Sequence, residues 1–135
     1  MSKETVNPAE LFDSQQYGFS QIVIASGGRT VYLSGQVAWD AEQQIVGPGD
    51  LRVQTRQALE NVKTAMAAAG GRLEDVVSMR IYIVEEALGE SRHISQALRD
   101  YFPAHQAPAT TWIGVRALAN PEFLIEVEAI GVIDP

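Results

Sequence analysis

Cysteine is absent from this chain of 135 residues. Its absence excludes disulfides, thiolate nucleophiles and cysteine-ligated metal sites, and it is compatible with the cytosol. Long apolar runs are missing as well. No stretch approaches the roughly 20 residues that a membrane span needs, and the polar residues 1–8 lack the apolar core of a signal peptide. We therefore expect a cytoplasmic protein with no membrane partner.

Clusters of positive charge are also missing. Ten Lys and Arg side chains against seventeen Asp and Glu give a formal net charge of −7, and no two basic residues are adjacent. Such a chain repels polyphosphate, so nucleic acid is not expected as a partner. The two histidines, His93 and His105, have no metal-ligand spacing, and we interpret them as surface or structural residues without a metal.

An apolar content of 46% over this length predicts one domain with a real core, residues 1–135. Period-two alternation bounded by turn residues predicts five strands, and apolar residues at helical spacing predict two helices. The expected strands are residues 19–25, 30–38, 76–84, 110–116 and 123–132, and the expected helices are residues 50–69 and 91–102.

Glycine and capping residues set the ends of these elements. The pair Gly27-Gly28 between two strands predicts a hairpin turn. Asp50 and Ser91 are expected to cap the two helices, and Gly70 is expected to end the first helix in a left-handed conformation.

The resulting order, ββαβαββ, predicts an α+β fold: a mixed β-sheet with two helices packed on one face. The second sheet face needs a cover, because it is expected to be apolar. The residues expected there are Val31, Leu33, Val37, Leu124, Ile130 and Val132. We therefore expect another copy of the chain on this face, with pockets at the subunit junctions.

Two acidic residues lie inside the last apolar run. At a period of two, Glu126 and Glu128 share one strand face with Ile130. One interpretation is a solvated face, or a pair with the arginine of a neighbouring strand, Arg80 or Arg116. The other is a carboxylate at the edge of a pocket, placed to move protons, with one of these arginines facing the same pocket.

Four segments, taken in order, resemble one protein family. They are Ser34-Gly35-Gln36, Gln57-Ala58-Leu59-Glu60-Asn61-Val62, Pro108-Ala109 and Ile125-Glu126-Val127-Glu128-Ala129-Ile130. Together they are similar to the Rid family, the reactive-intermediate deaminases of enamines and imines, also called YjgF-like proteins. The resemblance runs from about residue 19 to residue 132. It implies a chorismate-mutase-like fold, a homotrimer with three inter-subunit clefts, a small-molecule ligand, and no metal or organic cofactor.

The resemblance also implies roles for single residues. Ser34 and Gly35 match cleft residues that hydrogen-bond a ligand oxygen, although the same pair also suits a plain turn at a strand end. Glu126 matches the catalytic glutamate, which as a base or a water-orienting group helps water to attack a polarised C=N carbon. The product then breaks down to a carbonyl compound and ammonia.

Three positions depart from the family pattern. Thr110 takes the place of an arginine that holds the substrate carboxylate by two charged hydrogen bonds, a difference of ~2 kcal/mol or more in a partly buried cleft. Phe19 replaces a tyrosine, and Trp112 replaces a small residue or cysteine, unless its ring belongs to the core. The complete substrate-binding set that we expect is Phe19, Ser34, Gly35, Thr110, Thr111 and Trp112.

Three functions remain open. The first is enamine or imine deamination by Glu126 and an activated water. The second is non-catalytic binding of an apolar or neutral small molecule in the same cleft, which the loss of the arginine favours. The third is ribonuclease or translation inhibition, an activity of some relatives, and the acidic charge argues against it.

Overall fold

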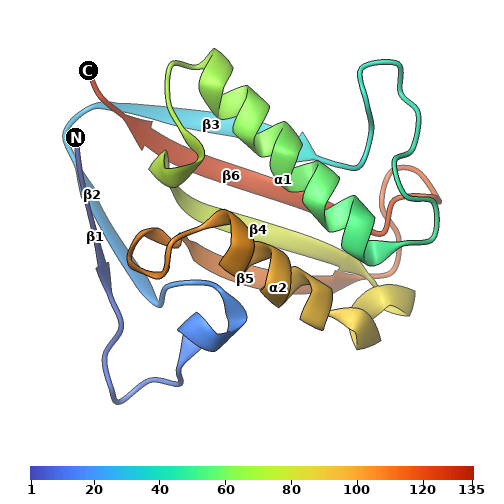
Figure 1. Cartoon of the computed structure of the whole chain (residues 1–135), viewed down its shortest axis with the longest axis horizontal. Helices are drawn as coiled ribbons and strands as arrows, with labels where there is room; N and C mark the ends of the chain where they lie inside the picture. Colours follow the sequence, from blue (N-terminus) through green and yellow to red (C-terminus); the bar gives the residue numbers. More distant parts are fainter.

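The computed structural model describes all residues from 1 to 135 and contains a main sheet with two helices on one face (Figure 1). The strand order is β3-β6-β4-β5, in which β6 runs antiparallel to β3 and β4, and β5 runs parallel to β4. The elements are β3 (Arg29–Gln36), α1 (Leu51–Ala68), β4 (Val76–Val84), α2 (Arg92–Tyr101), β5 (Ala109–Val115) and β6 (Ile125–Ile133). The predicted α+β class is confirmed. None of the helices combines the length and the apolar character that crossing a bilayer requires.

A two-stranded ribbon stands beside the main sheet, at the left of Figure 1. It pairs β1 (Ser2–Val6) with β2 (Ile22–Ser26) in antiparallel register. The predicted hairpin between β2 and β3 is therefore wrong, because these strands pair in different sheets, and β1 itself was not predicted. Gly28, with φ 89°, forms the corner between the two sheets. A Cβ on Gly28 would lie 2.0 Å from the carbonyl oxygen of Ile133, so the close approach requires glycine.

Lys3 of β1 holds this ribbon against the main sheet. Its Nζ donates hydrogen bonds to the carbonyl oxygens of Glu74 at 2.6 Å, Val76 at 2.8 Å and Gln106 at 2.6 Å. Burial lowers the pKa of Lys3 to about 8, against the opposing effect of the charges on Asp75 and Glu74. A polar strand therefore docks here through one satisfied ammonium group.

The helix α1 begins and ends as its sequence predicts. The side chain of Asp50 accepts a hydrogen bond from the N–H of Val53 at 3.0 Å. At the other end Gly70 has φ 92°, and the N–H of Gly71 donates to the carbonyl oxygen of Met66 at 2.9 Å. A left-handed glycine with this bond is a common way to close a helix.

The helix α2 begins without the predicted side-chain cap. Ser91 precedes Arg92, but its hydroxyl makes no capping hydrogen bond. Its φ of −60° and ψ of −15° continue the helical backbone of the preceding turn, η3 (Glu85–Glu90). The prediction for Ser91 is wrong, because a side-chain N-cap normally has an extended backbone.

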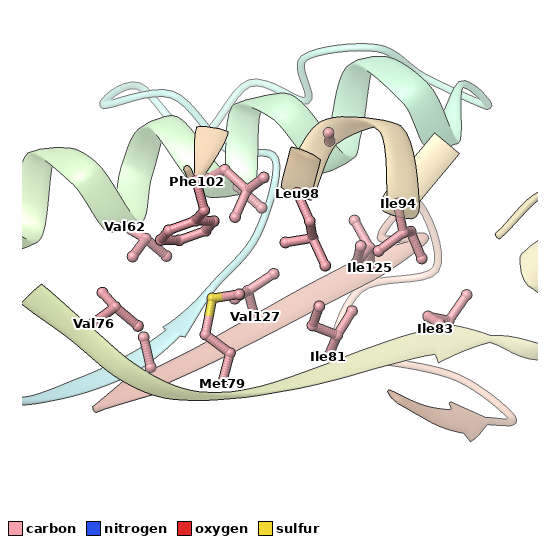
Figure 2. Packing of buried hydrophobic residues seen from close by; sticks show 14 of the residues in the cluster. Val62, Val76, Met79, Ile81, Ile83, Ile94, Leu98, Phe102, Ile125 and Val127 are labelled. Atoms are coloured by element: carbon pink, nitrogen blue, oxygen red, sulfur yellow. The ribbon is translucent and has the colours of Figure 1, made fainter. Parts of the chain in front are cut away.

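The core lies between the helices and the sheet. It is a cluster of 22 buried residues, most of them from the two helices and the central strands β4 and β6. Figure 2 shows Val62 of α1 and Leu98 of α2 pointing toward Met79 and Ile81 of β4 and Val127 of β6. This packing fixes β4 and β6 in place, and β6 carries the two glutamates.

The sheet face away from the helices, called the open face below, is less apolar than predicted. Val31 and Leu33 pack against the core, because strand alternation turns them toward the helices, and Leu124 is part of the core cluster. The expectation that these three residues lie on the open face is wrong. Tyr32, 77% exposed, and Ile130, 36% exposed, pair there in register instead.

Candidate functional site

Glu126 and Glu128 lie on the open face, as their spacing predicted. Both are half-buried, while Ile125, Val127 and Ala129, which alternate with them, are buried on the helix side. Their environments nevertheless differ, because each glutamate meets different neighbours across the sheet.

A β-bulge brings β3 against Glu126. The regular pairing of β3 with β6 is interrupted between Leu33 and Gln36, where Ser34 and Gly35 lie opposite a single residue of β6, Glu128. A Cβ on Gly35 would lie 1.9 Å from Oε2 of Glu126, so this carboxyl group rests directly on the glycine backbone. The bulge and the glycine together hold Ser34 and Glu126 at one end of the sheet.

Glu128 accepts a hydrogen bond from a neighbouring side chain, whereas the side chain of Glu126 makes no hydrogen bond or ion pair within the chain. The hydroxyl of Tyr82 donates a short hydrogen bond to Oε1 of Glu128, and this bond, together with burial, raises the pKa of Tyr82. Arg80 lies directly opposite Glu128 in the register of β4 and β6. None of the three ion pairs of the chain includes Arg80, Arg116 or either glutamate, so the predicted strand ion pair is not formed within one chain. Arg116 also lies just beyond the end of β5.

Glu126 lines a hollow of about 380 Å³ at the end of β3 and the start of β6. Eight residues line it: Gly35, Gln36, Val37, Trp39, Asp40, Asn61, Phe123 and Glu126. The rings of Trp39 and Phe123 meet edge to face with centroids 4.8 Å apart. The lining is therefore aromatic and acidic, and it contains no lysine, arginine or histidine.

Asn61 fixes the loop that follows β3. Its Nδ2 donates to the carbonyl oxygens of Val37 at 2.8 Å and Trp39 at 3.0 Å, and its Oδ1 accepts from Gln57 at 2.9 Å. Asn61 belongs to one of the family segments but had no predicted role, and Trp39, Asp40 and Phe123 were not predicted as site residues. These residues come from loops, and the periodicity of apolar residues does not predict where loop residues lie in space.

The other expected binding residues form a second group on the opposite side of the sheet. Thr110 and Trp112 pair in register with Met79 and Ile81 of β4, whose side chains are buried toward the helices. Nε1 of Trp112 donates a hydrogen bond to Oγ1 of Thr110 at 3.2 Å. The ring of Phe19 lies 6.1 Å from that of Trp112.

Two further rings extend this second group. Tyr17, in the short helix η1 (Ser14–Tyr17), lies 6.4 Å from Trp112, and Phe12 lies 6.2 Å from Phe19, centroid to centroid. Phe12 is 61% exposed and Tyr17 42% exposed. An aromatic cluster thus reaches the surface beside β5.

One chain does not bring the two groups together. The first group, Ser34, Gly35 and Glu126, belongs to β3 and β6, whereas the second belongs to the far edge strand β5, with β4 in between. Thr111 is separated from both neighbours on β5, because it pairs with Arg80 and so faces the open side. A cleft that uses both groups would have to form between two copies.

Comparison with known proteins agrees with the fold. Residues 14–133 match the family described as Endoribonuclease L-PSP. A RutC family protein of Pyrococcus horikoshii is 32% identical over 112 residues, which are 83% of this chain and 84% of that protein. The crystal structure of a Rid family protein from Yersinia pestis, YyfB, has a TM-score of 0.92 and 38% identity, and covers 98% of this chain and 100% of its own.

The structure of TdcF from E. coli with bound serine is also similar, with a TM-score of 0.68 and 29% identity over 88% of this chain and 95% of that one. The fold and the extent of these matches define an α+β protein of the Rid type. The chain belongs to the Rid family, which also carries the names YjgF and RutC.

Proposed function

We propose that the protein is a deaminase that hydrolyses reactive imines or enamines to a carbonyl compound and ammonia. The observation that carries this proposal is the position of Glu126. Its carboxyl group lies on the backbone of Gly35, at the rim of a hollow of about 380 Å³, and no group of the chain bonds to it. A carboxylate with free oxygens beside a pocket is suited to accept a proton from water.

The reaction needs water to be delivered to the C=N carbon. Glu126 takes a proton from the water as its oxygen attacks that carbon, and the tetrahedral intermediate then expels ammonia. The hydroxyl of Ser34 and the backbone of Gly35 supply hydrogen bonds that orient the ligand. This chemistry uses only side chains and backbone of the protein.

The site is completed, in this proposal, by a neighbouring copy in a homotrimer in the cytoplasm. Two features support an assembly. The open face exposes Tyr32 and Ile130 side by side, and β2 exposes Ile22 and Ile24. A neighbour seated on this surface would cover these residues and bring its own Phe19, Thr110 and Trp112 near Glu126.

Ammonia release tests the proposal. The purified protein is incubated with an enamine generated in situ from an amino acid, beside Glu126→Gln, which keeps the shape of the side chain and loses its basicity. The proposal predicts faster ammonia release with the wild type. Equal rates for wild type, variant and buffer would remove deamination of that substrate.

Non-catalytic binding of a small molecule is the second candidate, and one observation favours it. The residue at the family's arginine position is Thr110, which carries no charge. Its Oγ1 also accepts a hydrogen bond from Trp112 within the same chain. TdcF, which binds serine in its crystal structure, illustrates binding by a relative. A ligand present at ~100 times its dissociation constant would stabilise the fold by ~2.7 kcal/mol, which thermal unfolding can detect.

Ribonuclease activity, suggested by the family description, has less support. The chain carries a net charge of −7, and the hollow at Glu126 contains two acidic residues and no basic residue. A phosphate backbone would be repelled by both features.

A further inference from the structure

The electrostatic character of the hollow beside Glu126 limits what it can bind. Asp40 and Glu126 are its two charged residues, and both are acidic. Oδ1 of Asp40 accepts hydrogen bonds from the N–H groups of Glu42 at 2.9 Å and Gln44 at 3.0 Å, which hold this carboxylate in place. A ligand that carries a carboxylate would meet two like charges here, and a ligand that carries a positive charge would meet two opposite ones.

Aromatic rings also favour a positively charged ligand over a negatively charged one. Trp39 forms part of the wall, with Phe123 packed against it edge to face. An indole ring attracts an organic cation through its electron-rich face and also packs well against an apolar group. Toward a carboxylate, the two rings offer only the neutral indole N–H of Trp39, with no positive charge.

The second group of binding residues contains no positive charge of its own that could hold a carboxylate. Thr110 is uncharged: its Oγ1 accepts a hydrogen bond from Trp112 and leaves one neutral O–H to donate, where an arginine offers two charged N–H donors. Arg92 and Arg99 of α2 line a surface hollow with Trp112, and Arg99 also lines a hollow with Phe19, but neither arginine lines the hollow beside Glu126. The guanidinium of Arg99 donates one hydrogen bond to the carbonyl oxygen of Gln16 in its own chain, which holds this side chain on the helix side of β5.

We propose that this cleft accepts iminium ions and imines derived from amines, which lack a carboxylate, in preference to those derived from amino acids. The inference rests on the proposed function and specifies its substrate class. The reaction is R–CH=NH₂⁺ plus H₂O giving R–CHO plus NH₄⁺. The water oxygen bonds to the carbon, the C–N bond breaks, and both water protons end on the departing nitrogen, one of them through Glu126.

A place in a reaction sequence follows from this chemistry. The reaction that supplies the substrate is a two-electron oxidation of an amine at its C–N bond. The reaction that removes the product is oxidation or reduction of an aldehyde.

Binding of three matched compounds tests the charge preference without any turnover. 2-Phenylethylammonium, phenylalanine and 2-phenylethanol share one aromatic group and differ in charge and carboxylate, and titration calorimetry gives a dissociation constant for each. We expect the ammonium compound to bind about tenfold more tightly than phenylalanine. Equal or tighter binding of phenylalanine, or no binding of any of the three, overturns the inference.

A variant of Asp40 locates the source of the preference. Asp40→Asn keeps the oxygen that accepts from Glu42 and Gln44, and removes the charge. This substitution should raise the dissociation constant of 2-phenylethylammonium about threefold to fivefold and leave that of 2-phenylethanol unchanged. Glu10→Gln, which changes an exposed acid outside the hollow, is the control. An equal effect of the two substitutions contradicts the inference.

Turnover separates this inference from the proposed function. Imines of phenylacetaldehyde and of phenylpyruvate are generated in situ by oxidation of phenylethylamine and phenylalanine, and ammonia release is followed for each. Faster release from the amine-derived imine supports both proposals, and faster release from the amino-acid imine supports deamination alone. Selective binding of the ammonium compound with no release of ammonia supports the ligand class and removes the deaminase.

Discussion

Gly35 is the residue whose replacement reports most directly on Glu126. A Cβ at this position would lie 1.9 Å from Oε2 and 2.8 Å from Cδ of Glu126, all within a flexible side chain. The fold can therefore accommodate the methyl group only by turning the carboxyl group away from the β-bulge. The glycine thus connects the backbone of β3 to the placement of the candidate catalytic group.

Gly35→Ala should accordingly lower activity or ligand affinity about tenfold while thermal stability changes little. Gly89→Ala is the matched control, because a Cβ on Gly89 meets no atom within 4 Å and its backbone has no positive φ. Ammonia release and thermal unfolding are measured for both variants. Full activity of Gly35→Ala would show that the position of Glu126 does not matter.

Lys3 predicts a pH dependence of stability. Burial lowers the pKa of Lys3 from 10.5 to about 8 in the folded protein. Below pH 8 the ammonium is charged in both states. Between about pH 8 and 10.5 the folded state has released a proton that the unfolded state keeps, so this group makes the free energy of unfolding rise with pH. Lys3 is partly exposed, and solvent screening reduces the size of the effect.

Urea unfolding of wild type and Lys3→Met at pH 7.5, 9 and 10 measures this contribution. We expect the difference in unfolding free energy between them to shift in favour of the wild type as the pH rises. A difference that is constant across this range would mean that Lys3 titrates normally in the folded protein.

The helices provide a pair of positions that the sequence alone does not distinguish. Asp50 and Ser91 both precede a helix, and both were predicted as caps, but only Asp50 makes the capping hydrogen bond. Asp50→Ala should lower the unfolding free energy by about 1 kcal/mol. Ser91→Ala should change it by less than about 0.5 kcal/mol. Chemical denaturation measures both, and equal losses would contradict the cap assignment.

At the scale of helices and strands, the sequence predicts those features that a local pattern of apolar residues determines. Alternation located β4 at residues 76–84 and gave the faces of β6, because one face of each strand is buried under helices. It did not predict β1, whose docking depends on contacts of Lys3 with residues more than 70 positions away. The hairpin prediction failed for the same reason, because β3 pairs with β6, a strand far from it in the sequence.

The candidate site was predicted only in part, for a related reason. Glu126 stands out because an acid within an apolar strand is visible in the sequence, whereas Gly35 was expected only because Ser34-Gly35-Gln36 resembles a segment of the family. Trp39, Asp40 and Phe123 come from loops, and their meeting depends on Asn61 bonding to the loop after β3. No periodic pattern encodes that contact.

At the scale of the whole molecule, the open face predicts self-association. Tyr32 and Ile130 lie side by side and expose apolar surface there. Sedimentation should give the mass of three chains for the wild type and of one chain for Ile130→Glu. Lys63→Glu, on the exposed surface of α1, is the control and should remain a trimer. A monomeric wild type at micromolar concentration would contradict the proposed assembly.

The most direct test of a cleft shared between copies is complementation between two inactive variants. Glu126→Gln disables the part of the cleft on β3 and β6, and Trp112→Ala disables the part on β5. The two proteins are unfolded, mixed in equal amounts and refolded together, and ammonia release is compared with that of each variant refolded alone. If every site takes one part from each of two neighbouring copies, random mixing makes one half times one half, or about a quarter, of the sites fully wild type. Recovery of about a quarter of the wild-type rate is the predicted result, and no recovery would show that the two groups do not form one site.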